Sequence, residues 1–168
     1  MDLGTVANLA TAAAVIVGVV FGLIELKHAR REREDRAAFE VVHAMLTPEW
    51  MQSVIVVQSI ADGTAPQALE AEERLLRAAQ SAGIILEALG YSVFKRIVPL
   101  EVVDDLLGGT VRVAWRKLRG YVEFERARSG SQKSWEWFEW LAARLDEHAG
   151  RKTSLQLGAQ EAHRDWRP

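Results

Sequence analysis

The clearest candidates for metal binding are Glu40 and His43, which form a Glu-x-x-His motif. On a helix this spacing places both side chains on one face, as in the helices that supply ligands to carboxylate-bridged di-iron sites. Such a site needs the same motif from a second helix and two further glutamates that face inwards. We expect no such set in this chain, which also lacks the cysteines typical of zinc sites. The sequence therefore predicts no metal and no cofactor.

Carboxylate and nucleophile chemistry has equally little support. Asp104 and Asp105 are neighbours, and consecutive helical residues point about 100° apart, so we expect two exposed acids rather than a catalytic pair. Glu87 lies in an apolar segment, and we expect it at the edge of the apolar face of its helix. Gly108 and Gly109 lack the lysine of a phosphate-binding loop and predict a turn between two helices. With no thiol and no Gly-x-Ser-x-Gly, the sequence predicts a protein that is not an enzyme.

The elements that would position these residues begin with an apolar segment at the N-terminus. From Leu3 to Ile24 there is no charged side chain, and at about 1.5 Å per helical residue this length crosses a hydrocarbon layer of roughly 30 Å. A cleaved signal peptide would have a basic residue before a shorter apolar stretch and small residues after it, and neither is present. We therefore expect a transmembrane anchor over residues 1–26.

Basic residues follow the predicted span and none precedes it. These juxtamembrane residues are Lys27, Arg30, Arg31, Arg33 and Arg36. Because lysine and arginine are retained on the cytoplasmic side of a membrane, we expect the N-terminus outside and the remaining chain in the cytoplasm, with membrane lipid as one partner. The absence of cysteine fits a reducing compartment.

Small residues recur every four positions within the predicted span, at Ala10, Ala14, Gly18 and Gly22. Such a stripe lets two helix backbones approach closely, which is how many transmembrane helices associate in lipid. We therefore expect this face to mediate self-association or docking on another transmembrane helix.

The rest of the chain predicts an all-α fold. No glycine or proline lies between Leu23 and Thr47, so the anchor should continue as a charged helical stalk over residues 27–46. Thr47 and Pro48 have the types of a helix cap and a first helical residue. We then expect a cytoplasmic bundle of about five helices over residues 47–148 and a flexible tail over residues 149–168. The helices are predicted at about 48–61, 66–89, 99–107, 110–127 and 135–148.

Two features of this predicted domain are candidates for contact with a partner or with lipid. Arg112, Arg116 and Arg119 are spaced four and three residues apart and form a basic stripe, which could face anionic headgroups, an acidic partner or only solvent. Trp140 falls outside the apolar arc of its helix, and we expect it to be partly exposed. Nucleic acid is not expected, because the formal net charge is −2 and no binding motif is present.

Three longer motifs make the chain resemble a known family. They are RIVPLEVVDDLLGG (residues 96–109), AWRKLRGYV (residues 114–122) and WFEWLAARL (residues 137–145), placed after an uncharged N-terminal span and a charged stalk. This layout resembles an uncharacterised bacterial family of small membrane-anchored helical proteins, known only as a domain of unknown function. The resemblance implies a bacterial inner-membrane protein with a helical cytoplasmic domain, and it implies no activity.

We therefore expect a non-enzymatic, single-span protein that self-associates or serves as an accessory or scaffold subunit of a membrane complex, with no small-molecule substrate. The alternative is a membrane-perturbing or pore-forming effector of a bacterial defence or stress system. A pore needs a polar helix face, and here Thr5, Asn8 and Thr11 alone provide one, near the outer end of the span.

Overall fold

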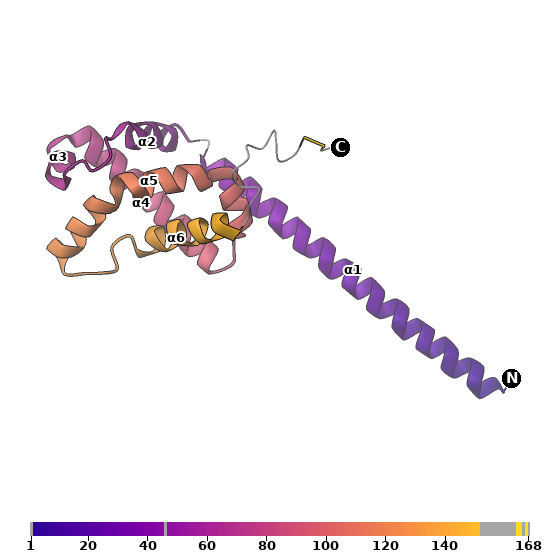
Figure 1. Cartoon of the computed structure of the whole chain (residues 1–168). Helices are drawn as coiled ribbons and strands as arrows, with labels where there is room; N and C mark the ends of the chain where they lie inside the picture. Colours follow the sequence, from indigo (N-terminus) through magenta and orange to yellow (C-terminus); the bar gives the residue numbers. More distant parts are fainter. Residues whose placement is uncertain (1, 46, 152–163, 166, 168) are drawn as a thin grey trace.

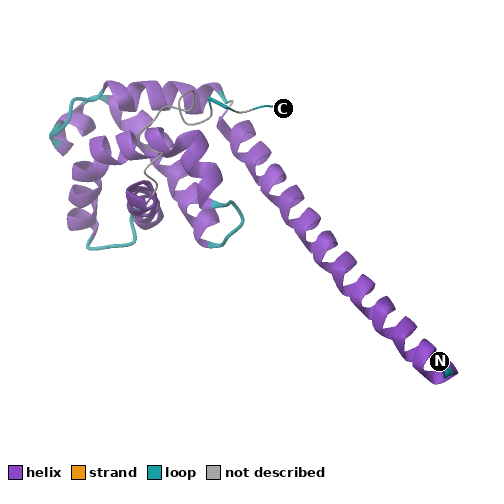
Figure 2. Cartoon of the chain, turned by 45° about the vertical axis from the view of Figure 1, so that its right-hand side comes forward, coloured by secondary structure: helices purple, strands orange, loops and turns teal. Residues whose placement is uncertain are grey.

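The computed structural model describes residues 2–45, 47–151, 164, 165 and 167, without the side chains of some α1 residues (Figure 1). All secondary structure in these residues is helical, which confirms the predicted all-α fold (Figure 2). The helices are α1 (Leu3–Met45), α2 (Pro48–Ser59), α3 (Pro66–Ala71), α4 (Glu73–Phe94), α5 (Leu100–Ser129) and α6 (Glu136–Arg151).

Helix α1 is one uninterrupted helix of 43 residues, about 65 Å long, as the absence of helix breakers predicts. Its N-terminal half extends away from the other helices, whereas its C-terminal end packs on them (Figure 1). Ala37 and Val41 are buried there, and α1 contacts α2 and α5. One helix therefore carries both the apolar segment and the attachment of the domain.

Helix α2 begins as its sequence predicts. The Trp50 N–H donates to Thr47 Oγ1 at 3.3 Å, and Pro48 occupies the first turn, where its missing N–H costs nothing. Trp50, Val56 and Val57 of this helix are buried. The cap thus sets the point at which the chain turns from α1 into the core.

Helix α4 lies at the centre of the domain and contacts α2, α3, α5 and α6. The core that it organises consists mainly of aliphatic side chains contributed by every helix of the domain, together with the rings of Trp50, Tyr121 and Phe138. Its fully buried members include Val56, Leu69, Leu86, Val103, Val111, Leu118, Phe138, Leu141 and Leu145.

The single helix predicted over residues 66–89 begins at Pro66 as expected, but it is interrupted at Glu72 and extends beyond Leu89. Glu72 is extended (φ −110°, ψ 103°) and separates α3 from α4. This break turns α3 so that Leu69 is completely buried between α4 and α5. At the other end α4 continues through Gly90 to Phe94. Gly90 does not end the helix; it lies where α4 packs against α6, and a Cβ there would lie 2.1 Å from the Trp137 carbonyl oxygen.

The turn predicted at Gly108 and Gly109 is also wrong, because α5 is continuous through both residues. A Cβ on Gly108 would lie 2.5 Å from Asp104 Oδ1 and 2.8 Å from Arg112 Nη1, so this glycine makes room for two charged side chains. Helix α5 ends instead at Gly130, which adopts the left-handed conformation (φ 66°) that favours glycine after a helix. The predicted tail over residues 149–168 lies largely outside the described residues, and α6 continues to Arg151.

These glycines generate a stability prediction. We expect Gly90→Ala to lower the free energy of unfolding by about 2 kcal/mol, because its methyl group would collide with the α6 backbone. Gly109→Ala is the matched control: a Cβ there meets nothing within 4 Å, so alanine should stabilise α5 by about 1 kcal/mol. Thermal unfolding of the full chain in mild detergent, followed by circular dichroism, measures both. Equal melting temperatures for the two variants would contradict the close α4–α6 contact.

Candidate functional site

The first candidate surface is the apolar part of α1. Residues Thr11–Ala29 have a mean hydropathy of 1.8, and none of this segment is buried. Large side chains such as Phe21 and Leu26 are 65% and 69% exposed. By length and composition this helix has the properties of a membrane span or a signal sequence.

The small-residue stripe lies on this exposed helix. Ala14, Gly18 and Gly22 are exposed, and a Cβ on either glycine would meet no atom within 4 Å. The side chain of Ala10 lies outside the described part of the chain. Along Ala14, Gly18 and Gly22, α1 therefore offers an open, flat surface to a second helix.

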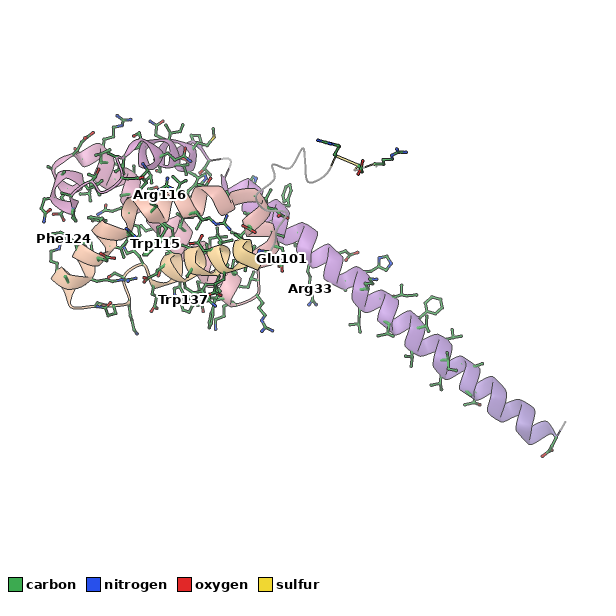
Figure 3. All side chains as sticks on the ribbon, in the orientation of Figure 1. Arg33, Glu101, Trp115, Arg116, Phe124 and Trp137 are labelled. Atoms are coloured by element: carbon green, nitrogen blue, oxygen red, sulfur yellow. The ribbon has the colours of Figure 1, made fainter. Side chains whose placement is uncertain are left out.

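The juxtamembrane basic residues lie where α1 approaches the domain. Lys27, Arg33 and Arg36 are exposed, and Figure 3 labels Arg33 at this point. The side chains of Arg30 and Arg31 are not among those that the structure describes. The described basic residues thus form a charged collar between the apolar segment and the helical domain.

A buried polar network joins α5 to α6. Asp104 is 7% exposed, and its two carboxylate oxygens contact Arg112 Nη2 at 2.9 Å and His148 Nδ1 at 2.9 Å. Arg112 also donates to the Leu145 carbonyl at 2.6 Å and to Asp146 Oδ1 at 3.1 Å. A single carboxylate therefore holds a cation of its own helix and the imidazole at the end of α6.

The expectation that Asp104 is exposed is wrong, whereas Asp105 is exposed as predicted. Asp104, Gly108 and Arg112 are spaced four residues apart, so they lie on one face of α5 with the glycine in the middle. Because Gly108 has no side chain, the arginine reaches back two turns to the carboxylate. This spacing is the sequence signal that could have identified the pair.

The predicted basic stripe is divided by its ion pairs. Arg112 belongs to the buried network, and Arg116 Nε lies 3.4 Å from Asp62 Oδ2 (Figure 3). Lys117 Nζ contacts the same carboxylate at 2.8 Å and donates to the Ile60 carbonyl at the end of α2. The hydrogen bond from Lys117, together with the two positive charges, lowers the pKa of Asp62 below its usual value.

Arg119, the third member of the stripe, is exposed and has no ion pair with a carboxylate of the described residues. Two of the three arginines therefore form ion pairs with carboxylates of the same domain, Arg112 partly buried and Arg116 at the surface. Contact of this stripe with lipid or a partner stays a prediction.

Glu87 has a structural role that its sequence context did not indicate. It is half-buried, and its Oε2 accepts the backbone N–H of Phe138 at 2.8 Å. Phe138 lies in the first turn of α6, whose N–H groups have no partner within the helix. The carboxylate of α4 thus caps α6 across the helix interface.

Trp140 is half-buried within an aromatic cluster on α4 and α6. Its ring lies edge-on to Phe94 at 5.9 Å and 6.2 Å from the ring of Trp137. Phe94 and Tyr91 are 47% and 44% exposed, and Lys95 Nζ lies 5.7 Å and 5.5 Å from their ring centroids. The domain therefore presents aromatic rings and a cation together at one surface.

The described residues contain no group of three or more His, Asp or Glu side chains that could hold a metal ion. Glu40 and His43 are exposed on α1. The sequence prediction missed a second Glu-x-x-His, Glu25 and His28. This motif is on the same helix about 22 Å away, too far to share an ion with the first.

The described residues thus form an all-α protein with one long apolar N-terminal helix. The chain belongs to the family named as a domain of unknown function, DUF4760, whose sequence profile matches residues 12–145. No curated protein and no solved structure matches the chain.

The buried network predicts a large difference between two neighbouring aspartates. Asp104→Ala should lower the free energy of unfolding by about 2–3 kcal/mol, because it leaves Arg112 and His148 without their shared partner. Asp105→Ala is the control: this side chain is exposed, so the change should stay within about 0.5 kcal/mol. Chemical denaturation of the two variants in the same detergent compares them directly. Similar losses for both would contradict the network.

Proposed function

We propose that this protein is a non-enzymatic, single-span protein of the bacterial inner membrane that self-associates or acts as an accessory or scaffold subunit of a membrane complex. The observation that carries the proposal is the exposure of the whole apolar segment Thr11–Ala29. Side chains such as Ile16, Phe21 and Leu23 are each more than 60% exposed, and in water a continuous apolar surface of this size is strongly unfavourable. A bilayer removes that cost.

Retention of the apolar helix is supported by its continuity with the domain. The helix that carries the apolar segment also buries Ala37 and Val41 against the domain, with no break between them. The family profile begins at residue 12 and therefore includes most of the apolar segment together with α2–α6. Both observations favour a permanent anchor over a leader that is removed.

The proposed topology places the N-terminus outside and the helical domain in the cytoplasm, because Lys27, Arg33 and Arg36 follow the predicted anchor at residues 1–26, whose own residues include no lysine or arginine. The test uses single cysteines in this cysteine-free chain. In spheroplasts a membrane-impermeant maleimide should label Asp2→Cys directly and Lys133→Cys only after permeabilisation. The reverse pattern would contradict the topology.

Self-association through the small-residue stripe has its own test. Full-length protein in mild detergent should form a discrete oligomer, and Gly18→Leu with Gly22→Leu should reduce its mass to that of a monomer, because bulky side chains would keep the backbones apart. The matched control, Ile16→Leu with Val20→Leu, changes the opposite face of the same helix and should leave the oligomer intact.

The outcomes separate the candidate functions. An oligomer that survives the glycine substitutions would move the contact to the helical domain, and a monomer in every variant would contradict self-association and favour an accessory subunit. Growth arrest on expression that depends on α1 would instead support the alternative, a membrane-perturbing or pore-forming effector.

A further inference from the structure

A groove of about 670 Å³ lies between the domain and the basic collar of α1. Its lining comes from five places in the chain: α1, the end of α4, the connection between α4 and α5, the start of α5, and α6. The side chains that matter are Arg33, Arg96 and Arg144, which are basic, and Phe94, Ile97 and Trp140, which are apolar. Figure 3 labels Arg33 and Glu101 on two of these elements.

The position of the groove along α1 sets its depth relative to the proposed span. Arg33 comes seven residues after Leu26, where the predicted anchor ends, which is about 10 Å along the helix. The polar headgroup layer on each side of a bilayer is roughly 5–8 Å thick beyond the hydrocarbon. The groove therefore begins at the outer edge of the headgroup layer, where long arginine side chains can extend back to the phosphates.

The charge of the groove is positive. Three arginines from different parts of the chain line it, and Glu101 is the one acidic residue among the lining residues that the structure describes. Arg144 Nη2 pairs with Glu147 at 2.6 Å, whereas Arg144 Nε is buried and has no hydrogen-bond partner in the described part of the chain. A guanidinium presents its N–H groups as a planar fork that matches the oxygens of a phosphate.

Arg96 occupies a position where glycine would be less strained. The Ile97 N–H donates to the Ser92 carbonyl and the Arg96 N–H to the Val93 carbonyl, both at 2.9 Å, which is the Schellman pattern of a helix C-terminus. In this pattern the residue at the position of Arg96 is left-handed and is usually glycine; here φ is 57°. A charged side chain at a strained position points to a use for the charge.

The apolar members of the groove are exposed beside these charges. Ile97 is 65% exposed and Phe94 47%, and Lys95 lies next to them in the same turn. Aromatic and aliphatic side chains next to arginine and lysine are typical of protein surfaces that lie in a membrane interface. A soluble acidic partner would explain the arginines but would leave the exposure of Ile97 at headgroup depth without a reason.

We infer that this groove binds the headgroup phosphate of an anionic phospholipid in the membrane that holds α1. Arg33, Arg96 and Arg144 contact the phosphate, while Phe94 and Ile97 enter the interface beside it. The inference rests on the proposed insertion of α1. It gives the helical domain a second membrane contact, so that the domain lies against the bilayer instead of rotating freely at the end of its stalk.

The test places a polarity-sensitive fluorophore on Ile97→Cys in the otherwise cysteine-free, full-length protein in lipid nanodiscs. Its emission should shift to shorter wavelength in discs that contain phosphatidylglycerol and remain at the aqueous position in discs of phosphatidylcholine alone. Ile84→Cys is the matched control: it is 68% exposed but lies on α4 about 15 Å before that helix ends, so its emission should be the same in both discs.

A second substitution separates lipid binding from folding. Arg96→Gly removes a charge and also relieves the left-handed strain, so the melting temperature should be unchanged or higher. The ratio of domain docked on the lipid to undocked domain, obtained from the emission at Ile97→Cys, should nevertheless fall about fivefold. This is the effect expected for one basic residue at an anionic surface. Arg119→Gln removes an exposed arginine outside the groove and should leave the ratio unchanged.

Three results would overturn the inference. They are an aqueous signal at Ile97→Cys in phosphatidylglycerol discs, an equal shift in both lipids, and a shift that Arg96→Gly does not reduce. In each case an alkaline wash separates the two proposals. If the protein stays in the disc after the wash, the proposed membrane insertion of α1 still holds and only the lipid site is contradicted. A protein that the alkaline wash removes contradicts the proposed insertion itself.

Discussion

The placement of every surface of the helical domain relative to the apolar helix depends on one packing contact, the burial of Ala37 and Val41 of α1 against α2 and α5. Because α1 has no break between Ala29 and Val41, this contact determines both the height and the rotation of the domain above the apolar segment. A flexible linker at this point would leave both undetermined. The uninterrupted helix is what allows Arg33 to share a groove with residues of α4, α5 and α6.

Helix α6 is held at both ends by carboxylates from other helices. Glu87 of α4 accepts an N–H of its first turn, and Asp104 of α5 contacts His148 near its end. Between these two points α6 carries Trp140 and Arg144, which line the groove beside α1. Glu87 and Asp104, which the sequence predicts at the edge of a helix face and in solvent, therefore position α6, and they orient a surface whose proposed ligand is a lipid.

The two proposed binding surfaces lie at different heights along α1. The proposed self-association surface lies on the open stripe of Gly18 and Gly22, and the proposed lipid site begins about two helical turns beyond the predicted anchor. The two surfaces act on different parts of α1, so one chain could associate with a second copy in the bilayer while its domain rests on the headgroups.

The sequence alone determined the features that depend on neighbours within a few residues. The apolar segment, the continuity of α1, the Thr47 cap and the end of α5 at Gly130 follow from local residue types, since helices are built from contacts between residues three or four apart. The tertiary structure alone decided what Gly90 and Asp104 do. Gly90 is a contact because Trp137 lies against it, and Asp104 is buried because His148, 44 residues later, contacts it. No local pattern specifies such partners, because their proximity exists only once the helices have packed.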